Sequence, residues 1–191
     1  MHRTNRTVFS CLALFACIAS FAAAQEPEVP YVPTADEGVQ VMLKLAGVKK
    51  SDIVYDLGCG DGRIVIAAAK TYGAHAIGID IDPQRIREAK ENAKKAGVED
   101  LTRFEQNDIF KADIHEATVV TLFLLPQVNL RLRPKLLHDL KPGTRIVSNT
   151  FDMGDWKPVK EQSLDVGDSY GHYGLSRRFF LWIIPQAAGK Q

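Results

Sequence analysis

The sequence is poor in cysteine and has no excess of charge of either sign. It holds three Cys among 191 residues, and its formal net charge is +1. Cys11 and Cys17 lie in the first 24 residues, so Cys59 stands alone in the rest of the chain, which therefore cannot form an internal disulfide. We expect Cys59 to fill space in the core rather than to act as a nucleophile.

The chain also lacks the patterns that accompany two kinds of ligand. Residues 25–191 carry 22 basic against 23 acidic side chains, so no basic footprint for nucleic acid is present. The histidines at positions 75, 115, 138 and 172 show no metal-ligand spacing with one another or with Cys59. We therefore expect no nucleic-acid partner and no metal.

The apolar stretch at the N-terminus, residues 8–21, is shorter than the roughly 20 residues that a membrane-spanning helix needs. Arg3 and Arg6 precede it and Ala22-Ala23-Ala24 follows, which is the pattern of a secretory signal peptide. The sequence predicts cleavage after Ala24 and export to the periplasm or the exterior, with no stable membrane span. An uncleaved, membrane-associated N-terminus or an organellar transit sequence is the alternative.

The remaining chain is predicted to form one domain. Residues 25–33 are a proline-punctuated linker or lid segment, residues 34–186 form the domain, and residues 187–191 are a tail. Strands are expected at 52–56, 75–80, 101–106, 117–124 and 144–149, with helices at 34–46, 62–70, 82–96 and 127–140. Thr34 and Glu37 form a capping box for the first helix, and Pro134 is expected to interrupt or restart the last one.

Alternation of strands and helices predicts an α/β fold with a mostly parallel sheet and helices on both faces. After residue 151 the pattern changes to two strands, near 159–166 and 178–184, which we expect to form an antiparallel hairpin. The fold class is therefore a Rossmann-like, seven-stranded sheet with a C-terminal antiparallel hairpin.

The most informative stretch is residues 53–65, where an apolar strand, a tight turn and a helix follow one another. Gly58, Gly60 and Gly62 suit a turn that needs positive φ and a backbone that a ligand can approach. The spacing is G-x-G-x-G with Asp56 two residues ahead, and it differs from the G-x-G-x-x-G of dinucleotide-binding folds. An NAD-dependent dehydrogenase is therefore disfavoured.

This stretch resembles motif I of the class I (seven-strand) S-adenosylmethionine-dependent methyltransferases. In open parallel sheets, ligands bind outside the carboxyl ends of the strands. Asp56, Asp80 and Asp108 fall at three such ends. The resemblance implies that Asp56 and the three glycines contact the methionine part of S-adenosyl-L-methionine, that Asp80 accepts the ribose hydroxyls, and that Asp108 accepts the adenine amino group. Taken singly, each acid is a strand-end cap or turn acid.

Residues 30–34, 56–65 and 151–156 together resemble the small protein-lysine methyltransferases related to those acting on mitochondrial inner-membrane proteins. In that group the segment before the first helix folds over the cofactor, which implies that Tyr31 and Thr34 lie near its methionine end. The alternative is that Tyr31 packs on the core and Thr34 only caps a helix.

Residues 121–126 hold neither the N-P-P-Y of amino-directed nucleic-acid methyltransferases nor a metal-binding acid pair. An apolar slot lined by Phe123, Pro126, Phe151 or Trp156 would suit a lysine amine, whose pKa falls on burial. The predicted function is methylation of a protein lysine, and no catalytic residue is identified. Alternatives are a small-molecule N- or O-methyltransferase and an exported, non-catalytic binding module on the same fold.

Overall fold

The computed structural model describes residues 32–164 and 177–186 of the chain. The predicted signal peptide, most of the predicted linker with Tyr31, residues 165–176 and the predicted tail lie outside these residues. The domain boundaries drawn from the sequence therefore stay a prediction.

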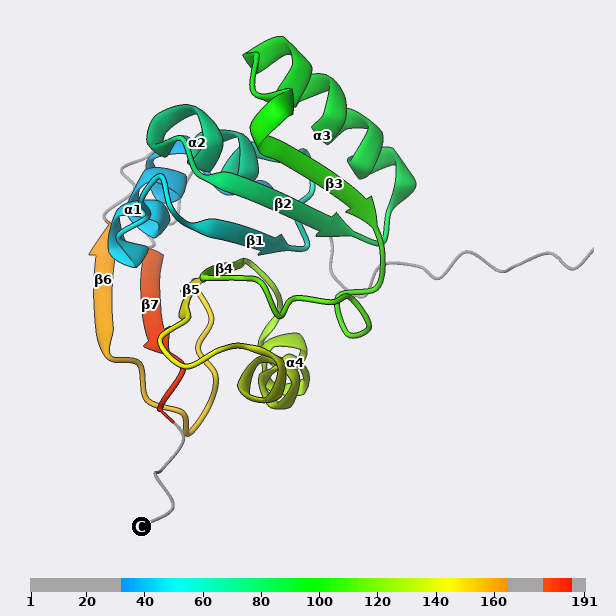
Figure 1. Cartoon of the computed structure of the whole chain (residues 1–191). Helices are drawn as coiled ribbons and strands as arrows, with labels where there is room; N and C mark the ends of the chain where they lie inside the picture. Colours follow the sequence, from blue (N-terminus) through cyan, green and yellow to red (C-terminus); the bar gives the residue numbers. More distant parts are fainter. Residues whose placement is uncertain (1–31, 165–176, 187–191) are drawn as a thin grey trace, which may run out of the picture.

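The described chain folds around one seven-stranded sheet with the order β3-β2-β1-β4-β5-β7-β6 (Figure 1). β7 runs antiparallel to its neighbours β5 and β6, and all the other neighbouring strands are parallel. The predicted fold class is confirmed. The strands are β1 (Ile53–Leu57), β2 (His75–Asp80), β3 (Thr102–Gln106), β4 (Val119–Leu122), β5 (Arg145–Asn149), β6 (Lys160–Leu164) and β7 (Arg177–Ile183).

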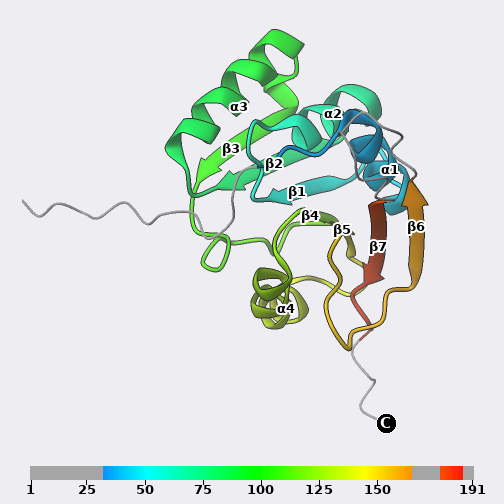
Figure 2. The ribbon, with the colours of Figure 1, turned by 180° about the vertical axis from the view of Figure 1, so that it is seen from behind.

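Helices cover both faces of the sheet, as the two opposite views show (Figures 1 and 2). α1 (Asp36–Ala46), α2 (Arg63–Tyr72) and α3 (Pro83–Ala96) pack on one face, and α4 (Pro126–Asp139) packs on the other. A 3-10 turn, Glu99–Leu101, precedes β3. None of the helices in the described ranges is long and apolar enough to cross a membrane.

The sheet is apolar on both faces because successive side chains of a strand point to opposite sides. In β1, Val54 belongs to the core cluster under α1, α2 and α3, whereas Tyr55 and Leu57 belong to the cluster under α4. This two-sided burial explains why the central strands read as almost continuous apolar runs in the sequence.

Two local predictions are wrong. The N-cap of α1 is Ala35, without a side-chain hydrogen bond, because the hydroxyl of Thr34 accepts instead from the Asn149 side chain on β5. α4 continues through Pro134 without interruption. Pro134 has no amide hydrogen to donate to the backbone carbonyl of Leu130, four residues earlier. Both residues lie on the exposed side of α4, where water can donate to that carbonyl instead.

The packing of Gly62 gives a first prediction. Gly62 has φ +80°, and a Cβ there would lie 2.8 Å from the ring of Phe104 and 2.9 Å from Cβ of Ala89. Gly97, which ends α3, has φ +67° but nothing within 4 Å of the same position. Gly97→Ala should therefore carry only the left-handed backbone cost, about 1–2 kcal/mol. Gly62→Ala should lose about 1–3 kcal/mol more through overpacking. Urea unfolding of both variants measures the difference, and equal losses would contradict it.

Candidate cofactor and acceptor site

A glycine turn forms the centre of the candidate site at the carboxyl edge of the sheet. Between the end of β1 and the start of α2, Gly58, Gly60 and Gly62 all have positive φ, at 86°, 53° and 80°. The amides of Gly58 and Cys59 donate to the carbonyl of Ile79 on β2, at 2.8 and 3.0 Å. The turn thus crosses the end of β2, and exposed Gly58 offers backbone with no side chain of its own to keep a ligand away.

Cys59 lies inside this turn and is 5% exposed. Burial raises the pKa of its thiol, and the carboxylates of Asp56 and Asp80 raise it further. Both effects disfavour the thiolate, which is the nucleophilic form. The expectation that Cys59 fills space is therefore confirmed by its burial.

Asp80, at the end of β2, braces the glycine turn. One carboxylate oxygen accepts from the amide of Gly60 at 2.9 Å, and the other accepts from the amide of Asp82 at 3.0 Å. Each oxygen keeps a further lone pair, because an ionised carboxylate has about four acceptor sites. Half-exposed Asp80 can therefore hold the turn and accept hydroxyl groups of a ligand at the same time.

Asp56, two residues before the first glycine, is 3% exposed. The hydroxyl of Thr121 on β4 donates to its carboxyl group at 2.7 Å. Burial, together with the nearby charges of Asp80 and Asp61, raises the pKa of Asp56 to about 7. The group therefore changes charge near neutral pH. Thr121 was not singled out from the sequence, because its partner lies 65 residues away.

Asp108 lies in the turn after β3, close to Asp80. The amide of the preceding Asn107 donates to the carbonyl of Asp80 at 3.0 Å. One Asp108 oxygen accepts from the amide of Phe110 at 2.9 Å, and Lys111 pairs with the other at 3.4 Å. The structure thus brings the three predicted acids to one edge of the sheet, with Asp108 also serving as a turn acid.

Thr34 joins this edge from the segment before α1 and is 4% exposed. Its carbonyl accepts from the guanidinium of Arg63 at 2.7 Å, and its hydroxyl accepts from the Asn149 amide at 3.3 Å. Arg63 also forms an ion pair with Asp61 at 2.6 Å. Sequence reasoning did not single out Arg63 or Asn149 as site residues. The only signals were that Arg63 directly follows the glycine turn and that Asn149 ends a strand.

The predicted acceptor residues separate into two groups. Phe123 follows β4, Pro126 begins α4 and Phe151 follows β5, so these three belong to the carboxyl edge. Trp156 instead packs against Trp182 of β7, with ring centroids 6.0 Å apart, and its carbonyl accepts from the Trp182 indole at 2.7 Å. Trp182 pairs with Ile146 in the amino-terminal half of β5, so Trp156 lies away from the other three.

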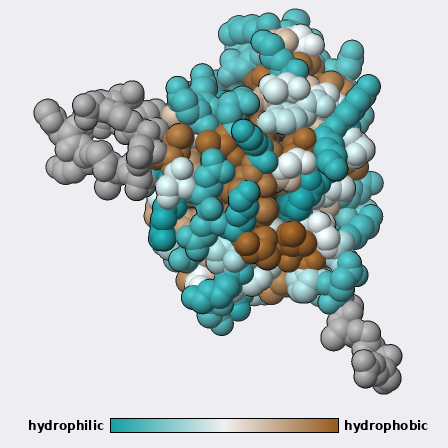
Figure 3. Space-filling model, turned by 90° about the vertical axis from the view of Figure 1, so that its left-hand side faces the viewer, coloured by the Kyte–Doolittle hydropathy of each residue, from teal (hydrophilic) through white to brown (hydrophobic). Residues whose placement is uncertain are grey.

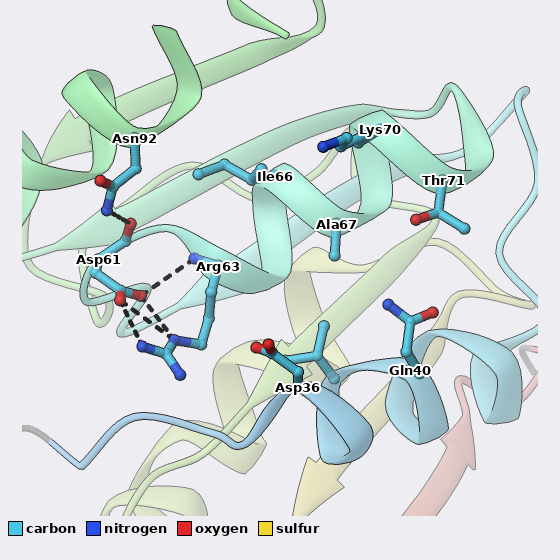
Figure 4. A pocket seen from close by; sticks show the side chains of 10 residues that line it. Asp36, Gln40, Asp61, Arg63, Ile66, Ala67, Lys70, Thr71 and Asn92 are labelled. Carbon is cyan, nitrogen blue, oxygen red and sulfur yellow. Dashed lines mark hydrogen bonds and ion pairs between the residues drawn. The ribbon is translucent and has the colours of Figure 1, made fainter. Parts of the chain in front are cut away.

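A groove of about 480 Å³ runs between α1 and α2 (Figure 4). Asp61 and Arg63 form one end of it, where the side chain of Asn92 on α3 donates to the Asp61 carbonyl at 3.0 Å. None of the predicted cofactor residues that the structure describes lines this groove. The groove therefore lies beside the glycine turn, on the face of the sheet that carries α1, α2 and α3, and it is not the predicted cofactor site. Within the described ranges, no group of three or more His, Cys, Asp or Glu residues could hold a metal ion.

Comparisons with known proteins agree on one family. The model of the ANTKMT methyltransferase domain matches residues 56–160. A protein-lysine N-methyltransferase of Saccharolobus islandicus is 50% identical over 84% of this chain and 96% of its own length. An adenine nucleotide translocase lysine N-methyltransferase of Mus musculus is 34% identical over 69% of this chain, and the match covers 57% of that longer protein. A solved structure described as an RNA methyltransferase from Salinibacter ruber in complex with S-adenosyl-L-homocysteine is 49% identical, with a TM-score of 0.76 over 84% of this chain and 98% of that one.

The sheet order, the antiparallel β7 and the glycine turn define a class I, seven-strand methyltransferase. Within that class, the chain belongs to the family of the ANTKMT methyltransferase domain.

The raised pKa of Asp56 gives a second prediction. The folded protein, with a pKa of about 7, binds this proton more tightly than the unfolded chain, with a pKa of about 3.9. Stability therefore falls as pH rises from about 4 to about 7. Asp56→Asn keeps the shape and an acceptor for Thr121 but removes the charge. The free energy of unfolding of the variant, minus that of the wild type, should grow by at most about 1.4 kcal/mol per pH unit in this window and then level off.

Urea unfolding across this pH range measures the difference. Asp113→Asn is a control, because hydrogen bonds from His115 lower the pKa of the exposed Asp113, so that its contribution to stability changes with pH only near and below the unfolded pKa of about 3.9. The difference between this variant and the wild type should therefore stay nearly constant from about pH 5 to about pH 7. A difference for Asp56→Asn that does not vary with pH would contradict the assignment.

Proposed function

We propose that the protein transfers the methyl group of S-adenosyl-L-methionine to the side-chain amine of a lysine in a protein substrate. The observation that supports this most strongly is the 50% identity to a protein-lysine N-methyltransferase over 96% of that enzyme. The glycine turn, with its three positive φ angles, and the adjoining Asp80 offer the backbone and the carboxylate acceptors that such a cofactor needs.

In this proposal the carboxyl edge of the sheet holds the cofactor. Asp80 accepts the ribose hydroxyls with its remaining lone pairs, and Asp108 accepts the adenine amino group. Asp56, Gly58, Gly60, Gly62, Thr34 and Tyr31 lie toward the methionine end. The fit rests on the exposed backbone of Gly58 and on the acceptor capacity of Asp80. When bound, the cofactor supplies an electrophilic methyl group on a positively charged sulfur.

The acceptor side is built from Phe123, Pro126 and Phe151. Apolar surroundings favour the neutral form of an entering lysine amine, so its pKa falls and its proton leaves to solvent. The neutral nitrogen then forms a bond to the methyl carbon as the carbon–sulfur bond breaks. Holding nitrogen, carbon and sulfur in line in a dry site supplies the catalysis, with no general base assigned to the chain.

RNA is the second candidate acceptor, because the Salinibacter structure at 49% identity is described as an RNA methyltransferase. The near-neutral charge of residues 25–191 opposes it, since phosphate contacts need clustered basic side chains. The absence of N-P-P-Y after the fourth strand opposes transfer to a base amino group. These two features favour a protein acceptor.

Methyl-labelled S-adenosyl-L-methionine tests the acceptor. The purified protein is incubated with total protein extract, with the same extract after acetylation of its lysines, and with total RNA. We expect label in the untreated protein extract alone. Label in RNA or in the low-mass fraction would overturn the proposal in favour of a nucleic-acid or small-molecule acceptor. Cofactor binding without any transfer would instead favour a non-catalytic binding module.

We also propose that the protein is exported, on the basis of Arg3, Arg6 and the apolar residues 8–21. Mass spectrometry of protein isolated from cell fractions should find an N-terminus at Gln25 outside the cytosol. Protein with Arg3 intact in the cytosol would overturn the proposal.

A further inference from the structure

A strained turn follows β5 at the carboxyl edge of the sheet. Thr150 has φ +69°, and it is the one residue other than glycine with positive φ in the described part of the chain. The amide of Phe151 donates to the carbonyl of Asn149 at 2.8 Å, so Thr150 is the central residue of a three-residue turn of the rarer, strained γ form. A β-branched residue is a genuine outlier there, whereas glycine would be unstrained.

Neighbouring elements hold this turn from two sides. The amide of Thr150 donates to the carbonyl of Arg178 on β7 at 2.7 Å. The Asn129 side chain on α4 donates toward the carbonyls of Phe151 and Asp152, at 3.3 and 3.4 Å. Strained conformations of this kind persist where the surroundings over-determine them, and they cluster at functional sites.

The side chain of Thr150 begins a chain of hydrogen bonds across the sheet edge. Its hydroxyl donates to the carbonyl oxygen of the Asn149 side chain at 2.9 Å, which leaves the Asn149 amide to donate to the hydroxyl of Thr34 at 3.3 Å. Arg63, beside the glycine turn, donates to the carbonyl of the same Thr34 at 2.7 Å. Asn149 is 0% exposed and Thr34 is 4% exposed, so water does not compete strongly for the bond between these two side chains.

We propose that Thr150 is a positioning residue of the cofactor site. Its hydroxyl fixes the orientation of the Asn149 amide, which holds Thr34 against the glycine turn, while Arg63 holds Thr34 from the other side. The inference rests on the proposed function, because it takes Thr34 to lie beside the methionine end of the cofactor. A turn with a purely structural role would be better served by glycine, so the hydroxyl is the reason for a strained threonine at this position.

Three variants of the purified protein test the inference by calorimetric titration with S-adenosyl-L-homocysteine and by thermal unfolding. Thr150→Gly should unfold at the same or a higher temperature than the wild type, because the strain is relieved. It should nevertheless bind about fivefold more weakly, the effect of one lost hydrogen bond. Thr150→Ser keeps the hydroxyl and should bind as the wild type does. Asp80→Asn, which loses a charged acceptor, is the positive control and should weaken binding about tenfold or more.

Thr34→Val tests the other end of the chain of bonds without touching the turn. It should weaken binding by a similar factor, and adding Thr150→Gly to it should cause no further loss, because both changes break one path. If Thr150→Gly proves too unstable to titrate, Thr150→Val, which keeps the branched shape and removes the hydroxyl, takes its place in both comparisons. Unchanged affinity in either single variant, or additive losses in the double variant, would overturn the inference.

The wild-type titration separates this inference from the proposed function. A wild type that binds neither S-adenosyl-L-methionine nor S-adenosyl-L-homocysteine refutes the proposed function itself. A wild type that binds both, beside a Thr150→Gly variant with equal affinity, refutes only the role of Thr150.

Discussion

The structure depends on how the chain passes from β1 to α2 across the end of β2. Two successive amides, of Gly58 and Cys59, bond to one carbonyl of Ile79, which fixes the turn to the neighbouring strand. That geometry is possible because three residues adopt positive φ, and because Gly62 leaves room for Phe104 and Ala89 beneath it. The same turn exposes backbone at the carboxyl edge of the sheet. The requirement for glycine in this turn therefore serves both the packing of the core and the candidate cofactor site.

Electrostatics at this edge are unfavourable in the protein alone. Asp56 has been taken out of water beside two other carboxylates, and its raised pKa expresses that cost. Backbone amides stabilise the charge of Asp80, and the guanidinium of Arg63 stabilises that of Asp61. The carboxyl group of Asp56 accepts a hydrogen bond from the hydroxyl of Thr121 and has no cation beside it among the described residues. A positively charged ligand nearby would favour the ionised form of Asp56. In the proposed function, the positive charge of the bound cofactor would offset part of the electrostatic cost of burying Asp56.

Much of this could be read from the sequence, and the reasons are local. Apolar periodicity and glycine spacing act over a few residues, so the elements, the hairpin and the glycine turn were predictable, with strand ends shifted by at most two residues. Long-range partners were not. Thr34 looks like an N-cap, yet its hydroxyl bonds to Asn149, 115 residues away, and the α1 cap is Ala35. Likewise, no local pattern marks the left-handed Thr150 or the packing of Trp156 on Trp182.

The proposed acceptor side of the sheet is built differently from the proposed cofactor side. No helix lies between β3 and β4, and residues of that connection, such as Ile114, cover the sheet face beside α4 directly. The proposed acceptor edge is thus formed by strand ends and the short segments that follow them, with Phe123 and Phe151 partly exposed. Figure 3 shows apolar surface interspersed with hydrophilic side chains on the side that carries β6. An acceptor that brings its own folded surface, as a protein does, can reach an edge of this kind, whereas a small molecule would need the enclosing pocket that ligand sites usually provide.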